Sequence, residues 1–159
     1  LAPRSRRSLR RSKHSHDHIG RMTRAVHRTA VCSKPEAKVR FEQAEAFLSV
    51  ARLTLDSESD ETTPGVAAAL AVLAGIAASD ALCCSRLGRR PRGSDHRQAI
   101  TMLESIAPFG PTLAKSLQDL LAAKDDAHYG ATLVSKAKAL AMIRRATTII
   151  DAARNIVTE

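Results

Sequence analysis

The sequence predicts an all-α fold, an antiparallel bundle of about five helices. Aromatic residues make up only 3% of the chain, so the bulky side chains that fill many sheet cores are scarce. No segment keeps for long the alternation of apolar and polar residues that strands show. Apolar residues instead recur at helical spacing in segments separated by short turns, and such segments pack as a bundle.

The first helix is expected to begin at Ser33 and to end at about Leu55. Ser33 and Glu36 have the spacing of a capping box, and Pro35 is tolerated in the first turn. The acidic segment 56–63 that follows is expected to be a loop. The residues available for burial on this helix are Val39, Phe41, Ala46, Leu48, Val50 and Leu53.

The second helix is expected to begin at Thr63-Pro64 and to reach Leu87, because glycine, here Gly88, is typical of the position after a helix. Apolar residues cover most of its circumference, as expected for the central helix of a bundle. Its longest apolar run has 13 residues, whereas a helix that crosses a bilayer needs about 20. We therefore expect a buried helix and no membrane contact. Asp80, late in this helix, is expected to pair with an arginine of the following loop.

The three remaining helices each have Ser, Asp or Thr at the expected N-cap. Their expected ranges, caps included, are 94–106, 112–129 and 135–157, and a turn at 108–111 separates the first two. Their candidate core residues are Ile100, Leu103, Leu113, Leu117, Leu120, Leu121, Leu140, Ile143, Thr147, Ile150 and Ile156.

The net charge of +9 is concentrated at the N-terminus. Residues 1–34 hold ten Lys or Arg and a single acid, so the rest of the chain is balanced. A segment so rich in Arg, Ser and His cannot bury enough apolar surface to offset the entropy of ordering it. We therefore expect residues 1–33 to be a disordered basic tail, dispensable for folding, and residues 34–159 to be the bundle. The high pI belongs to the tail and does not mark the bundle as a nucleic-acid binder.

Cysteine usage predicts neither disulfides nor a metal site. Cys83 and Cys84 are neighbours on one helix and do not easily bridge each other, and with Cys32 they form no framework. A reducing cytoplasm fits this usage best. The three cysteines lack the spacing of zinc ligands, and no glycine-rich nucleotide motif occurs. The alternating histidines at 14–18 have no further ligands nearby in the sequence. No metal or other cofactor is expected.

The connection between the second and third helices is the candidate site. Five arginines surround His96 at the expected N-terminus of a helix, where backbone N–H groups and the helix dipole favour an anion. The neighbouring positive charges disfavour the cationic imidazole, which suits His96 to act as a base. Two interpretations stay open, a site for a phosphate-bearing ligand and a solvated basic loop. The arginines are Arg86, Arg89, Arg90, Arg92 and Arg97.

Two segments resemble the HEPN family of α-helical bundles, over about residues 66–157. Residues 79–88 followed by Asp95-His96 are similar to the family's long helix, its glycine-ended loop and the histidine that opens the next helix. Residues 120–129, followed by a last helix that starts at a serine, are similar to the family's leucine-rich helix ending in Arg-x-x-Ala-Asp-Tyr. Lys124 and His128 stand here in the places of the Arg and the Asp, and Tyr129 matches the Tyr.

The resemblance implies activity on RNA. Ribonuclease members of the family place an Arg before a His with four to six residues between them; five residues separate Arg90 from His96, and six separate Arg89 from it. The residue after that Arg is often small and polar in the family, whereas Pro91 follows Arg90. The implied catalytic residues are therefore His96 with Arg90 or Arg89.

Binding roles and partners are implied in the same way. The residues expected to bind RNA or a nucleotide are Arg86, Arg92, Arg97, Lys124 and Tyr129. The resemblance implies a homodimer, with the apolar second helix at its interface, and a metal-independent ribonuclease toxin paired with a nucleotidyltransferase-type antitoxin. The alternatives are a non-catalytic domain that binds nucleotide or RNA, and a helical bundle whose basic loop docks on an acidic protein.

Overall fold

The structure, a computed structural model, describes residues 29–57, 60–93, 96–129 and 132–158, with the side chains of 125–129 excepted. Within these ranges the chain forms five helices and a two-stranded antiparallel sheet, so the predicted all-α bundle is confirmed. The elements in chain order are β1 (Thr29–Val31), α1 (Lys34–Asp56), α2 (Thr63–Leu87), β2 (Arg89–Pro91), α3 (His96–Glu104), α4 (Gly110–Tyr129) and α5 (Lys136–Val157).

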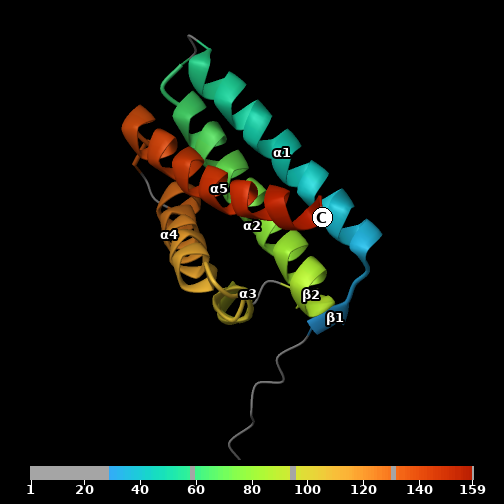
Figure 1. The fold of residues 1–159 in the computed structure, drawn as a ribbon. Helices are drawn as coiled ribbons and strands as arrows, with labels where there is room; N and C mark the ends of the chain where they lie inside the picture. Colours follow the sequence, from blue (N-terminus) through green and yellow to red (C-terminus); the bar gives the residue numbers. More distant parts are fainter. Residues whose placement is uncertain (1–28, 58–59, 94–95, 130–131, 159) are drawn as a thin grey trace, which may run out of the picture.

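The central helix of the bundle is α2. It packs against α1, α5, α4, α3 and β2. Figure 1 shows α1 and α2 side by side, with α5 lying over them and α4 and α3 beyond. Within the described ranges only α2 is long and apolar enough to cross a membrane, and 72% of its most apolar window is buried in the protein. Its composition is therefore that of the core helix the sequence predicts.

Small residues allow α2 to lie close to its neighbours. Ten of its buried residues are alanine or glycine or cysteine, and at Gly75 the approach is tightest: a Cβ there would lie 2.5 Å from Cδ1 of Leu120 on α4. The helix ends as predicted at Gly88, which has a left-handed φ of 63° and donates its N–H to the Cys84 carbonyl at 3.1 Å. A residue with a side chain is strained in that conformation.

The predicted capping box at the start of α1 is confirmed. The Ser33 hydroxyl accepts the Glu36 N–H, and the Glu36 carboxylate accepts the Ser33 N–H at 2.8 Å. The prediction of which residues of this helix face the core is only partly right, because the predicted set combined residues from two opposite faces of the helix. Phe41 and Leu48 are buried, but the face that meets α2 is otherwise formed by alanines and Leu55, which let the two helices approach closely. The candidates on the opposite, exposed face are Val39, Ala46, Val50 and Leu53.

The last three helices follow the prediction with small shifts. The third helix ends at Glu104 rather than Ile106, and α4 begins at Gly110 rather than Thr112. Ser135 caps α5 as predicted, its hydroxyl accepting the Lys138 N–H at 3.2 Å. Among the candidate core residues, the prediction for Leu140 is wrong, because 39% of this residue is exposed. The leucines of α4 and the isoleucines at 143 and 150 are buried as predicted. Ile100, Thr147 and Ile156 are partly buried.

The expectation that the cysteines form no disulfide is wrong. Cys32 and Cys84 are bonded, across a sequence separation of 52, and Cys83 is free and buried. The bond holds the segment before α1 against the end of α2, where β1 pairs with β2 and the Cys32 N–H donates to the Gly88 carbonyl at 3.0 Å. The prediction of a reducing compartment depended on the absence of disulfides and is therefore no longer supported.

The boundary expected between tail and bundle also shifts. Residues 29–33, expected in the tail, belong to the folded body through β1, the disulfide and the Ser33 cap. The rest of the expected tail, 1–28, lies outside the described residues.

Candidate functional site

The arginine-rich connection between α2 and α3 is a strand in its first half. Arg90 stands opposite Ala30 in the register of β1 and β2, and Pro91 stands opposite Thr29 and is buried. Gly93, with a φ of 86°, follows the strand. The expected helix caps Ser94 and Asp95 lie outside the described residues. Pairing with β1 fixes the backbone that carries Arg89 and Arg90, so this segment is more ordered than the loop the sequence predicts.

Asp80 is the one buried carboxylate among the residues that the structure describes. Only 7% of the residue is exposed, and its Oδ2 accepts hydrogen bonds from Nη2 and Nε of Arg40 at 2.8 and 3.1 Å. The expected salt bridge exists, but its partner was wrongly predicted: the arginine comes from α1 rather than from the loop after α2. The fork of a guanidinium suits a carboxylate in a site with little water.

Two of the predicted catalytic residues act on the same carboxylate. Burial raises the pKa of Asp80, and the positive charges of Arg40, then Arg90 and then His96 oppose that rise. Three cationic groups from α1, β2 and α3 therefore act on one acid. Arg90 also lowers the pKa of the exposed Glu36 on α1 through its charge, so two arginines stand against two carboxylates, and the cluster has an excess of positive charge when His96 is protonated. Such a cluster favours an anion.

Two buried polar groups lie close to this cluster in the sequence. Burial, together with the charge of Asp80, raises the pKa of the Cys83 thiol to about 12, so it is not a thiolate nucleophile at neutral pH. Gln98, two residues after His96, is 8% exposed, and its Oε1 accepts no hydrogen bond from the described residues. Buried amides are normally paired, so this oxygen is available to a donor.

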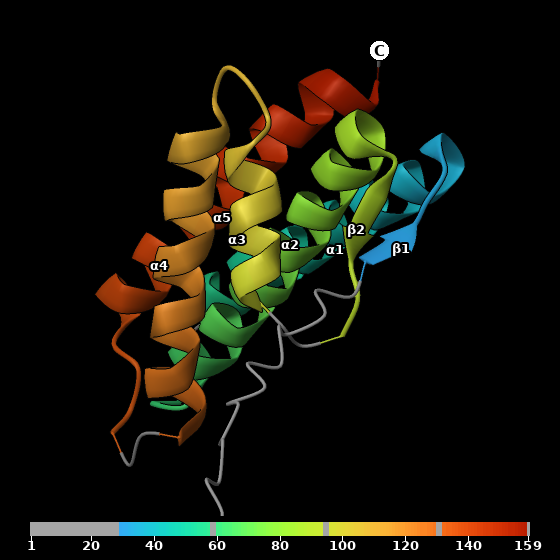
Figure 2. The ribbon, with the colours of Figure 1, turned by 90° about the horizontal axis from the view of Figure 1, so that it is seen from below.

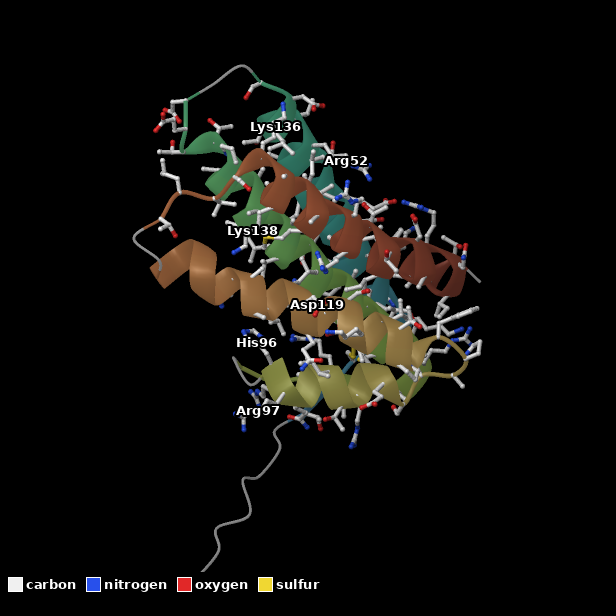
Figure 3. All side chains as sticks on the ribbon, turned by 90° about the vertical axis from the view of Figure 1, so that its left-hand side faces the viewer. Arg52, His96, Arg97, Asp119, Lys136 and Lys138 are labelled. Carbon is white, nitrogen blue, oxygen red and sulfur yellow. A yellow bond between two sulfur atoms is a disulfide. The ribbon has the colours of Figure 1, made fainter. Side chains whose placement is uncertain are left out.

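The remaining predicted site residues are spread more widely. Figure 3 shows His96 at the start of α3 on the side toward α4, and Arg97 on the other side of α3. Arg89, Arg92 and Arg97 are exposed around the connection, whereas Arg86 is exposed on the last turn of α2 and lines two cavities at the end of the bundle. Lys124 is partly buried on α4, and the side chain of Tyr129 lies outside the described part of the chain.

Arg40 is the residue of the cluster that the sequence did not single out. It lies on α1, forty residues before Asp80 in the chain. Its one signal is its position two turns after the start of an amphipathic helix, which is ordinary for an exposed arginine. Among the described residues, no group of three His, Cys, Asp or Glu side chains is placed to hold a metal ion.

Comparison with known proteins adds nothing to these observations. No family model matches the chain, and no curated protein matches it.

Proposed function

We propose that the protein is a HEPN-like domain that acts on RNA, and that the cluster of Arg90, His96 and Asp80 cleaves RNA without a metal. The observation that carries the proposal is that Arg90 and His96, which have the spacing of the family's Arg and His, both act electrostatically on the buried Asp80. Residues on two different elements thereby act on one acid. This shared effect supports an arrangement in which a phosphate bound by Arg90 also meets the imidazole of His96.

The proposed chemistry needs only these side chains and water. His96 takes the proton of a ribose 2′-hydroxyl, whose oxygen attacks the adjacent phosphorus as the bond to the 5′-oxygen breaks, and water protonates the departing 5′-oxygen. In the alternative, His96 protonates the departing 5′-oxygen and water accepts the proton of the 2′-hydroxyl. The products are a 2′,3′-cyclic phosphate and a free 5′-hydroxyl. Arg90 donates N–H groups to the phosphoryl oxygens, where negative charge grows in the transition state. The negative charge of Asp80, which accepts its hydrogen bonds from Arg40, attracts Arg90 and stabilises the imidazolium that forms when His96 accepts the proton.

A gel assay with labelled RNA tests the proposal. General acid–base catalysis contributes about 10²–10⁴-fold, so His96→Ala should lose most cleavage while RNA affinity stays nearly unchanged. Arg90→Ala should weaken cleavage and binding together, because an arginine contacts phosphate in both ground and transition states. Arg144→Ala, which removes an exposed arginine on α5, is the control. EDTA should leave cleavage intact. A wild type that does not cut, or His96→Ala that cuts equally well, would rule out the ribonuclease.

The second candidate is a non-catalytic domain that binds RNA or a nucleotide. It is favoured by the exposed arginines around β2 and α3, which are accessible to phosphates regardless of the imidazole: Arg89, Arg92 and Arg97. In that case affinity should fall steeply with salt, as counterions are released from the nucleic acid. Binding should then survive His96→Ala and decline with each arginine that is replaced.

The homodimer implied by the resemblance stays part of the proposal, but we place its interface on a different surface of the protein. The sequence placed the interface on α2, but that helix is mostly buried. The outer face of α1 instead exposes Val39, Val50 and Leu53, which are 52%, 49% and 68% exposed and lie at near-heptad spacing. A second copy or the proposed nucleotidyltransferase-type antitoxin would cover this face. Leu53→Glu should convert a dimer to a monomer in light scattering, and a wild-type monomer would contradict the homodimer.

A further inference from the structure

A single cavity of about 280 Å³ lies between the second half of α1 and the later turns of α5. Figure 2 shows α1 on one side of α2, with α3 and α4 together on the other side. The lining residues on α1 lie between Glu45 and Asp56, whereas the partner of Asp80 is Arg40, in the first half of the same helix. The cavity is therefore separate from the Asp80 cluster.

Two charged side chains in the lining, Arg52 and Asp56, have no oppositely charged partner among the residues that the structure describes. They are one turn apart on α1, a spacing at which such side chains often pair. The Arg52 guanidinium instead donates to the Thr147 hydroxyl on α5 at 3.0 Å. The other charged lining residues, Glu45 and Arg154, neutralise each other in an ion pair of 3.0 Å. The cavity therefore presents one cationic and one anionic group to a ligand.

The end of α1 adds to the preference of Asp56 for a cation. The C-terminal end of a helix carries a partial negative charge, and the last turn of α1, which ends at Asp56, contains no basic residue. Arg154 is already paired with both Glu45 and Asp151. An ammonium group is therefore the best match for Asp56. A carboxylate is the best match for Arg52, because a guanidinium donates two parallel N–H bonds to it.

The rest of the lining is largely apolar. Leu48 and Ile150 are 5% and 0% exposed and belong to the core, and Leu53 beside them is 68% exposed. A polar ligand group placed against these side chains would lose its hydrogen bonds to water without replacement. An aliphatic group has no such cost and gains stabilisation by covering the exposed part of Leu53.

Size and chemistry together identify the class of ligand. Pockets for drug-sized ligands usually measure about 300–1,000 Å³, so this cavity fits a smaller molecule. We propose that it binds a free α-amino acid with an aliphatic side chain, whose carboxylate lies on Arg52, whose ammonium lies on Asp56, and whose side chain packs on the apolar lining. An α-amino acid carries both charges next to one carbon and so contacts two side chains one helical turn apart. This site does not depend on the proposed action on RNA.

Titration of the full chain with L-leucine tests the site, with methyl NMR signals as the readout. We expect the signals of Leu48, Leu53 and Ile150 to shift together, with a Kd on the order of 1 mM for a ligand of this size. Isoamylamine lacks the carboxylate and isocaproate lacks the ammonium, so each should bind about fivefold more weakly. The protein is kept at a concentration at which light scattering gives a monomer, because a second copy on the outer face of α1 would cover Leu53.

Variants of the two charges decide whether they hold the ligand. Arg52→Gln and Asp56→Asn should each weaken leucine binding about fivefold. Two exposed charges on the first half of α1 are the controls, and Lys38→Gln and Glu42→Gln should leave the Kd unchanged. Asp56→Asn should also lose the preference for leucine over isocaproate, because the ammonium then has no carboxylate partner. Circular dichroism verifies that each variant is folded.

Three results would each overturn the proposal. The first is an absence of shifts at leucine concentrations well above the expected Kd. The second is a set of shifts confined to methyl groups outside the cavity. The third is an Asp56→Asn protein that prefers leucine to isocaproate as strongly as the wild type does.

Discussion

Reduction of the Cys32–Cys84 disulfide should destabilise the fold by about 4 kcal/mol. The bond joins residues with a sequence separation of 52. In the loop-entropy description, a cross-link over a loop of this length lowers the entropy of the unfolded chain by about 14 cal/mol/K, and this corresponds to about 4 kcal/mol at 25 °C. The two cysteines form a small buried cluster with Ala37, apart from the main core. Little other apolar packing therefore holds the segment before α1 in place.

Urea unfolding followed by far-UV circular dichroism measures this loss. Reductant should lower the unfolding free energy of the wild type, whereas Cys32→Ala should have the lower stability with and without reductant and so controls for the reductant itself. Thiol labelling of denatured protein should modify one cysteine, Cys83, before reduction and all three afterwards. Three labelled thiols before reduction, or an unchanged urea midpoint after it, would refute the reasoning.

Two further predictions concern the core. Because burial raises the pKa of Asp80, the stability that this group contributes is full below its ordinary pKa of 3.8 and is lost as pH rises through the raised folded value. The unfolding free energy of Asp80→Asn should therefore rise relative to wild type between about pH 3 and pH 7 in urea titrations, and a pH-independent difference would contradict this. Gly75→Ala overpacks against the buried Leu120 at a cost of about 1–3 kcal/mol, of which the better helix propensity of alanine offsets about 1 kcal/mol. Gly65→Ala, with its Cβ 4.0 Å from Val134, has no such clash and is the control. If the thermal denaturation midpoint of Gly75→Ala is not below that of Gly65→Ala, the tight contact is disproved.

Most of the fold is predictable because its signals are local. A capping box, a helix-ending glycine and a serine cap each lie within one turn of the boundary that they set, so the ends at Ser33, Gly88 and Ser135 are found from the sequence. The sheet could not be predicted from the sequence, because each strand has only three residues and β2 is formed by arginines and a proline. Its order comes from pairing with a distant strand rather than from strand propensity.

The site is only half predictable for a related reason. Arg90 and His96 are close in the chain and share a recognisable spacing, but Asp80, the acid on which both act, is partnered by Arg40 from another helix. Likewise, Cys32 and Cys84 are paired by the way α1 returns alongside α2. Neither pairing has a signal in residue spacing, since each depends on how two helices are aligned.

The position of the two strands in the chain predicts the order in which the protein assembles. β1 precedes α1 and β2 follows α2, so pairing of the strands closes a loop that contains both long helices, and we expect it to follow the formation of the helix hairpin. During synthesis β1 emerges first and stays unpaired until β2 follows. Arg90 is carried by β2, so its approach to Asp80 belongs to the same late step. Three-residue strands also open at lower free energy than a buried helix. In hydrogen exchange, the amides of β1 and β2 should therefore exchange well before those of α2.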